Sequence, residues 1–236
     1  MANLRKYYNA RVNSLEKEEL LKQVGHSVNG KAISIKDFES IIMDINNALD
    51  LSNDDDLLDL CCGNGVITKQ LSTFCHSIYG VDFSHELISI AKTNSSSNNE
   101  YFINCDIFDI HKHLSESINF SKVLMFGSLQ HFTHQRFSDL LELIKSLCGK
   151  EFTIFFGFVT DKDYKWQFYN TIKKRLLYFY RRLMKTDVMG TWWDKKNIKS
   201  VCEEMNLECH FININFGNYG YPYRFHFTVK NITKKR

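Results

Sequence analysis

The sequence has 236 residues, of which 44% are hydrophobic and 24% are charged, a composition that excludes a disordered or collagen-like chain. No apolar run approaches the roughly 20 residues of a membrane span. The net charge of +3 is uneven, because residues 1–160 hold 14 basic and 20 acidic side chains whereas residues 161–236 hold 16 and 7. The last third is therefore either a surface for an anionic partner or an ordinary solvated surface.

The seven cysteines cannot all pair within one chain, and Cys61 and Cys62 are adjacent. Reduced thiols fit this pattern better than a disulfide framework. The first residues lack the apolar stretch of a signal peptide. We therefore expect a cytoplasmic protein. No C-x-x-C pair occurs, so we expect no metal site.

Short apolar runs alternate with amphipathic segments from residue 56 onward. The runs predict strands at 56–62, 76–83, 100–108, 121–128 and 151–159, and the intervening segments predict helices at 66–74, 84–93 and 134–148. The strand candidates are continuously apolar, as are strands that are buried on both faces of a parallel sheet. The alternation predicts a doubly wound α/β fold.

Two regions fall outside this rhythm. Residues 1–50 are predicted to form an N-terminal helical lid segment. The main domain is predicted at residues 51–236. Within it, residues from about 161 to 193 are predicted to form a helical cap insertion rich in aromatic and basic side chains. Residues 23–31 are expected to be a polar loop. A helix at 194–206, with Asp194 as its N-cap, precedes two candidate antiparallel strands at 207–217 and 223–231.

The strongest motif is Leu57-Leu-Asp-Leu-Cys-Cys-Gly-Asn-Gly65. A strand carrying Asp59 is followed by a turn with Gly63 and Gly65 and then by a helix. Glycines in such a turn let the backbone approach a ligand closely. The motif alone also fits a simple tight turn between a strand and a helix.

The spacing of two further acids strengthens the functional interpretation. Asp82 follows Asp59 by 23 residues and ends the second predicted strand. A carboxylate at that position is suited to accept hydrogen bonds from both ribose hydroxyls. Asp106, which is 24 residues further on, is expected to end the third strand. Strand ends on one sheet edge are where open α/β sheets bind ligands.

With these residues, the sequence resembles the class I S-adenosylmethionine-dependent methyltransferases. Their D-x-G-C-G-x-G pattern corresponds to Asp59-Leu-Cys-Cys-Gly-Asn-Gly65, and Cys61 stands where the first glycine is usual. Gly80-Val-Asp-Phe-Ser84 and Asn104-Cys-Asp-Ile107 match their second and third strand ends. A nicotinamide oxidoreductase is disfavoured, because Thr68 occupies the place of its third glycine.

The resemblance implies S-adenosylmethionine as cofactor, a Rossmann-like seven-stranded sheet with a C-terminal antiparallel strand pair, and a role for each matching residue. Asp59 lies near the ammonium group, Asp82 holds the ribose, and Asp106 accepts from the adenine amine. The full set of implied cofactor-binding residues is Asp59, Cys61, Gly63, Asn64, Gly65, Asp82, Phe83, Asp106, Ile107, Gly127 and Ser128.

The segment Phe126-Gly-Ser-Leu-Gln-His-Phe132 is expected beside the transferable methyl group, which makes His131 the candidate general base. An imidazole of ordinary pKa can accept a hydroxyl proton near pH 7. The alternative is that His131 only shapes or orients the loop. His134 is expected to cap or decorate the next helix.

Two groups of residues are candidates for lid and substrate contacts. Tyr7, Tyr8 and Arg11 precede the core, and Arg181 and Arg182 belong to the basic cap. Cations and aromatics suit a small polar or anionic acceptor. The alternative is helix packing with solvated charges. No oligomeric state is predicted.

The sequence therefore predicts a methyltransferase acting on an oxygen of a small polar molecule. The chain is similar to methyltransferases of bacterial surface-polysaccharide or capsule gene clusters, which suggests a sugar hydroxyl or a phosphoramidate or phosphate oxygen as acceptor. The alternatives are a nucleic-acid methyltransferase that uses the basic last third, and a non-catalytic protein that binds S-adenosylmethionine.

Overall fold

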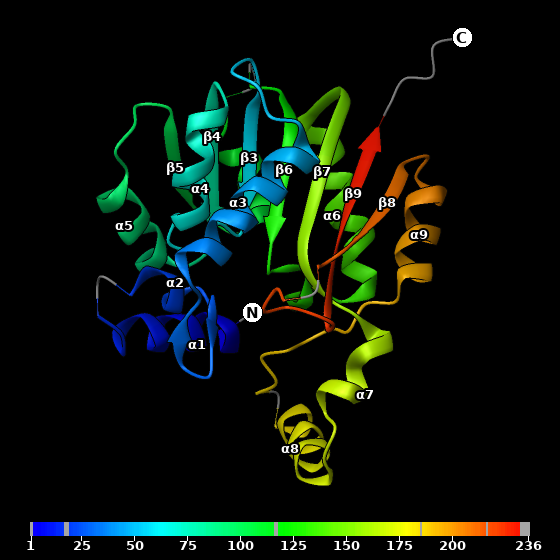
Figure 1. Cartoon of the computed structure of the whole chain (residues 1–236). Coiled ribbons are helices and arrows are strands. Elements are labelled where there is room, and N and C mark those ends of the chain that lie inside the picture. Colours follow the sequence, from blue (N-terminus) through cyan, green and yellow to red (C-terminus); the bar gives the residue numbers. More distant parts are fainter. Residues whose placement is uncertain (1, 17–18, 116–117, 185, 216, 232–236) are drawn as a thin grey trace.

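The computed structural model describes residues 2–16, 19–115, 118–184, 186–215 and 217–231. Its centre is a seven-stranded sheet in the order β5-β4-β3-β6-β7-β9-β8 (Figure 1). The strands are β3 (Asp56–Leu60), β4 (Ser77–Asp82), β5 (Glu100–Asn104), β6 (Phe120–Phe126), β7 (Cys148–Thr160), β8 (Glu208–Asn213) and β9 (Arg224–Asn231). The first five strands pair in parallel, and β9 pairs antiparallel with both β7 and β8. The predicted Rossmann-like fold is confirmed.

Helices cover both faces of the sheet because alternate residues of its strands are buried on opposite sides. Side chains of α3 (Ile35–Leu49) and α4 (Val66–Leu71) pack on Leu57, Ile78 and Leu124. On the other face, α6 (His134–Leu147) and α9 (Lys195–Glu204) pack on Leu58, Val123 and Phe156. Asp194 caps α9, as predicted, by accepting from the Lys196 amide.

A close contact across α4, α5 (His85–Asn94) and β5 explains one glycine of the motif. A Cβ on Gly65 would lie 2.8 Å from the Phe102 ring and 3.0 Å from Ala91 Cβ. Gly65 also has a left-handed backbone, with φ of 72°. Gly65 therefore permits helix packing behind the turn.

The first 50 residues are mostly helical but also form a small hairpin. They contain α1 (Ala2–Asn13), α2 (Leu20–Gln23), β1 (Ser27–Val28) and β2 (Lys31–Ala32), followed by α3. The expectation of a loop at 23–31 was wrong, since β1 and β2 pair antiparallel around Asn29 and Gly30, which both have positive φ. Figure 1 shows α1 and α2 below one end of the sheet.

The segment after β7 is helical and lies at the same end of the sheet (Figure 1). It contains the 3₁₀ helix η4 (Lys162–Tyr164), α7 (Lys165–Phe168) and α8 (Ile172–Leu183). Only Tyr178 of α8 is buried, against Tyr169 and Trp192. The chain then returns to the body, where the Trp193 indole donates to the Leu129 carbonyl.

Three local predictions need correction. Strand β5 ends at Asn104, because the Asp106 side chain accepts from the Phe108 amide and starts the 3₁₀ helix η2 (Ile107–Lys112). Strand β7 begins three residues before the predicted 151. The residue that caps α6 is Thr133, whose hydroxyl accepts from the Arg136 amide, and His134 is the first residue of that helix.

No helix in the described ranges is both long and apolar enough to cross a membrane.

Candidate active site

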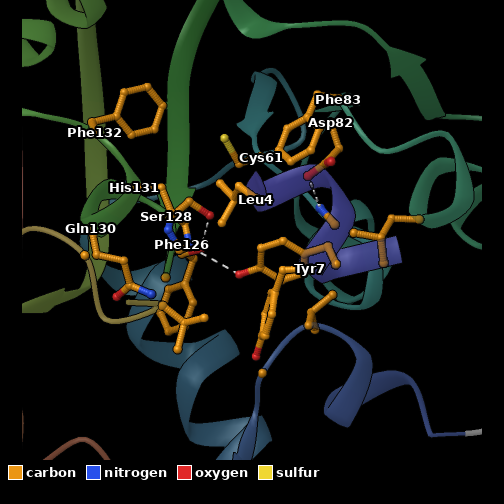
Figure 2. A pocket seen from close by; sticks show the side chains of 18 of the residues that line it. Leu4, Tyr7, Cys61, Asp82, Phe83, Phe126, Ser128, Gln130, His131 and Phe132 are labelled. Atoms are coloured by element: carbon orange, nitrogen blue, oxygen red, sulfur yellow. Dashed lines mark hydrogen bonds between the residues drawn. The ribbon is translucent and has the colours of Figure 1, made fainter. Parts of the chain in front are cut away.

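A cavity of about 1190 Å³ opens where β3, β4 and β6 end. Its walls come from α1, the turn after β3, the ends of β4 and β6, the loop after β6, and residues 186–191. Figure 2 shows labelled side chains of α1, of the turn after β3, and of the ends of β4 and β6 around this cavity. The cavity thus brings together the glycine turn, α1 and residues 186–191, although they lie far apart in the sequence.

Asp59 is a buried carboxyl group on the acidic side of the cavity. Only 3% of its surface is exposed, and burial raises its pKa to about 7. The Thr68 hydroxyl donates a 2.6 Å hydrogen bond to Asp59, and this bond opposes the rise. The nearby negative charge of Asp82 raises the pKa of Asp59 further. Thr68 was not predicted as a site residue.

Asp82 holds the turn and the end of β4 together. One carboxylate oxygen accepts from the Gly63 amide at 3.0 Å, and the other accepts from the Ser84 amide at 2.9 Å. Burial raises the pKa of Asp82, while these backbone donors and Arg5 oppose the rise. Each oxygen keeps a further lone pair for a ligand hydroxyl.

The turn after β3 has the left-handed backbone that the motif predicts. Cys61 and Gly63 have φ of 61° and 59°, and both line the cavity. A Cβ on Gly63 would lie 2.6 Å from Val24 Cγ1, so only glycine fits beneath the lid segment. Asn64 and Gly65 do not line the cavity, because Asn64 donates to the Leu20 carbonyl and Gly65 packs on Phe102.

The remaining predicted cofactor residues also border the cavity. Phe83 and Ile107 line it beside Asp106, and Gly127 and Ser128 line it after β6. Arg5 of α1 lies over the Phe83 ring at 5.5 Å. The Ser84 hydroxyl donates to Asn9 of α1 at 3.1 Å. The lid helix is therefore held against the end of β4.

His131, which Figure 2 labels, and Tyr8 both line the cavity. The Tyr8 hydroxyl and His131 Nε2 are 3.2 Å apart. Burial and the positive charge of Arg224 lower the pKa of His131 to about 4, and burial raises the pKa of Tyr8. Both groups are therefore uncharged at neutral pH. The expectation of an ordinary imidazole pKa was wrong, because desolvation and the charge of Arg224 both disfavour the protonated ring.

The cavity contains a cation that the sequence did not single out. Arg224, the first residue of β9, donates to the Phe158 carbonyl at 2.7 Å and also to the Gln130 side chain. Its guanidinium lies 4.5 Å from the Phe158 ring centroid. His26 lies nearby, and its Nδ1 is 2.9 Å from the Tyr219 hydroxyl. No local motif marks these residues, since β9 approaches the site only through sheet topology.

The predicted lid cations have different positions. Arg11 lines the cavity but donates to the Lys22 carbonyl at 2.6 Å and to the Tyr7 hydroxyl at 3.0 Å. Arg182 lines the cavity, whereas Arg181 on the same helix does not. Of the two candidate cap arginines, the structure therefore places only Arg182 at the cavity.

Within the part of the chain that the structure describes, no group of three or more His, Cys, Asp or Glu residues is placed to hold a metal ion.

The model of a protein family described as a methyltransferase domain matches residues 57–150. This range includes the glycine turn, Asp82 and Asp106. This segment is a class I S-adenosylmethionine-dependent methyltransferase domain. A protein from Schizosaccharomyces pombe, named as the uncharacterized methyltransferase C70.08c, is 43% identical over 49 residues. That match covers 21% of this chain and 19% of the other protein.

Solved structures share the fold of the methyltransferase domain and its flanks. The complex of DhpI with SAM and HEP has a TM-score of 0.63 at 16% identity and covers 97% of this chain and 96% of its own. Magnesium protoporphyrin IX methyltransferase from Synechocystis PCC 6803 has a TM-score of 0.62 at 14% identity. This match covers 97% of this chain and 98% of the other. The plantazolicin methyltransferase BpumL has a TM-score of 0.63 at 13% identity. This match covers 97% of this chain and 96% of the other.

Proposed function

We propose that this chain transfers the methyl group of S-adenosylmethionine to an oxygen of a small polar acceptor. The observation that carries the proposal is that one cavity is lined both by the acids of the methyltransferase domain and by His131. The acids suit the cofactor, and the uncharged histidine suits an acceptor hydroxyl.

The residues present fit S-adenosylmethionine. The turn carries three left-handed residues, Cys61, Gly63 and Gly65, and offers a close backbone approach at Gly63. Asp59 would hold the ammonium group, Asp82 the ribose hydroxyls, and Asp106 with the Ile107 amide the adenine edge. Phe83 would pack on the adenine face, and Gly127 and Ser128 would border the sulfonium. When bound, the cofactor supplies a methyl group to the acceptor oxygen and leaves as S-adenosylhomocysteine.

His131 would take the proton of the acceptor hydroxyl in this reaction. Its neutral ring is available over the whole range above its pKa of about 4. Tyr8, which is 3.2 Å from His131 Nε2, would orient the ring. Alignment of the acceptor is the larger contribution in such transfers, worth up to roughly 7–11 kcal/mol in model reactions.

The lid and the cap would enclose the reactants. Residues 1–50, with Tyr7 and Arg11, form the lid in this proposal, and residues 161–193, with Arg182, form the cap of a 51–236 domain. A sugar hydroxyl or a phosphoramidate or phosphate oxygen of surface-polysaccharide synthesis is the acceptor that the sequence resemblance supports.

Mass spectrometry of ligands that copurify with the protein tests the cofactor, with calorimetric titration of S-adenosylhomocysteine as the second measurement. We expect S-adenosylmethionine or its demethylated product in the wild type. In Asp82→Asn we expect the copurifying ligand to be lost and the titrant to bind about 10- to 100-fold more weakly. Asp109→Asn is the matched control, because Asp109 is exposed and pairs with Lys112. An empty wild-type protein that also fails to bind the titrant would contradict the proposal.

Release of S-adenosylhomocysteine in the presence of sugar and phosphorylated acceptors distinguishes an enzyme from a protein that only binds the cofactor. Filter binding to RNA across salt concentrations tests the nucleic-acid alternative, because phosphate contacts impose a steep salt dependence. We expect turnover with a small acceptor and no steep salt-dependent RNA binding.

A further inference from the structure

The guanidinium of Arg224 lines the cavity without an acidic partner. Its hydrogen bonds go to the Phe158 carbonyl and the Gln130 amide oxygen, both uncharged, and it forms no ion pair with any carboxylate of the described residues. Burial lowers its pKa to about 10, so it stays charged at neutral pH. Arg224 is half-buried, and a partly desolvated cation without a counter-charge costs free energy, which a bound anion would offset.

The groups around Arg224 are uncharged at neutral pH. Burial, together with the charge of Arg224, lowers the pKa values of His26 and His131 to about 4. Burial raises the pKa values of Tyr8 and Tyr219. These four side chains come from α1, the loop before β1, η3 (Leu129–His131) and the loop before β9. Their hydroxyls and ring nitrogens can hydrogen-bond an anion but cannot neutralise the guanidinium.

None of the described carboxylates that line the cavity forms an ion pair with Arg224. Asp59 and Asp82 accept from Thr68, Gly63 and Ser84. Asp106 accepts from the Phe108 amide. Asp187 accepts from the Met189 amide with Oδ1, while its Oδ2 is buried without a hydrogen-bond partner and its charge acts on Tyr169. The cavity therefore has an acidic side and a positively charged side, and the positive side includes the wall with His131.

We propose that Arg224 is the anchor for an oxyanion on the acceptor, a carboxylate or a phosphate-type group, which it binds beside His131. This inference rests on the proposed function. The planar guanidinium fork matches the paired oxygens of either group. An acceptor held there would present an oxygen to His131, whose neighbour Gln130 accepts a hydrogen bond from Arg224.

Binding of simple anions to the protein saturated with S-adenosylhomocysteine tests the proposal. Inorganic phosphate and acetate are titrated calorimetrically at constant ionic strength set with sodium chloride. We expect at least one of them to bind the wild type, and the preferred one to indicate the class of oxyanion. Arg224→Gln should weaken that binding by about 10- to 100-fold, as expected for a charged hydrogen-bonding partner. Arg224→Lys should give an intermediate loss.

Arg136→Gln is the matched control, since Arg136 also lines the cavity but is exposed and pairs with Asp139 at 3.5 Å. Its anion affinity should equal that of the wild type. Equal losses in Arg136→Gln and Arg224→Gln would overturn the proposal. Loss of S-adenosylhomocysteine binding in folded Arg224→Gln would also overturn it, because Arg224 would then hold the cofactor carboxylate.

A measurement on the wild type alone keeps the test independent of the variants. An anion at Arg224 offsets the charge that lowers the pKa values of His26 and His131, so both should rise when the preferred anion is added. Histidine ring signals followed by NMR across pH would show this rise. Unchanged pKa values at saturating phosphate and acetate would overturn the inference. Failure of the wild type to bind S-adenosylhomocysteine would instead contradict the proposed function.

Discussion

The hydroxyl of Thr68 donates a 2.6 Å hydrogen bond to the carboxyl group of Asp59, and both side chains are buried. This contact occurs where a dinucleotide-binding turn would carry its third glycine. Because burial raises the pKa of Asp59 to about 7 and Thr68 opposes the rise, the hydroxyl helps to keep the carboxyl group ionised. An ionised Asp59 is what the cofactor ammonium group requires.

Thr68→Val removes that hydroxyl while keeping the shape of the side chain. The pKa of Asp59 should rise, and a rise of one unit from about 7 lowers the ionised fraction at pH 7 by about fivefold. Wild-type affinity for S-adenosylhomocysteine should increase as pH rises through 7, and the midpoint should move upward in the variant. Titration calorimetry between pH 6 and 8 measures the affinity of each protein and the midpoint of its pH dependence. Thr73→Val, at an exposed hydroxyl, is the control, and coincident curves for Thr68→Val and the wild type would remove Thr68 from this role.

Asp82→Asn should weaken binding of S-adenosylhomocysteine by about 10- to 100-fold, because charged hydrogen bonds to ribose are lost. Asparagine keeps one acceptor for the Gly63 or Ser84 amide, whereas alanine would release both. The conservative variant therefore tests binding without opening the turn. Titration calorimetry with a urea unfolding curve separates the two effects. Unchanged affinity in a stable variant would place the ribose elsewhere.

The acidic half of the site could be predicted from the sequence because it is built from local signals. Asp59 and Asp82 lie in strands whose apolar runs are visible in the chain, and parallel pairing brings those strand ends to one edge. The same local signals misassigned Gly65, since a glycine in a turn does not reveal whether its missing Cβ leaves room for a ligand or for a ring such as Phe102.

The half of the site that contains Arg224 and His131 depends on tertiary structure. Arg224 reaches the cavity because β9 pairs antiparallel with β7, in contact with the Phe158 carbonyl. Nothing near residue 224 in the sequence marks this position. The uncharged state of His131 likewise follows from its burial beside Arg224, which the sequence does not contain.

His226→Gln should make the protein less sensitive to acid. His226 is 5% exposed, its Nδ1 accepts from the Phe158 amide at 2.9 Å, and burial lowers its pKa to about 4. The unfolded chain binds the proton more readily, so the stabilising contribution of the neutral ring is complete above about pH 6.5 and is lost as pH falls toward 4. Such a group contributes a slope of about 1.4 kcal/mol per pH unit.

Urea unfolding at pH 4.5, 5.5, 6.5 and 7.5 measures that slope as the free energy of unfolding. Glutamine can still accept from the Phe158 amide but does not titrate, so its slope should be shallower than that of the wild type. The raised pKa of Asp59 acts in the opposite direction but is common to both proteins. His210→Gln, at an exposed histidine of β8, is the control. Parallel slopes for His226→Gln and the wild type would show that His226 is not the group that titrates.

His131→Asn tests the proposed base. If His131 takes a hydroxyl proton, the variant should bind S-adenosylhomocysteine normally and lose about 10²–10⁴ in single-turnover rate. The wild-type rate should be level from about pH 5.5 to 8 and should fall only near pH 4, because the neutral ring is the working form and its pKa is about 4. An acceptor that is already an oxyanion would give a smaller loss. His134→Asn, at an exposed ring beyond η3, should keep the wild-type rate. A full rate in His131→Asn would exclude His131 as the base.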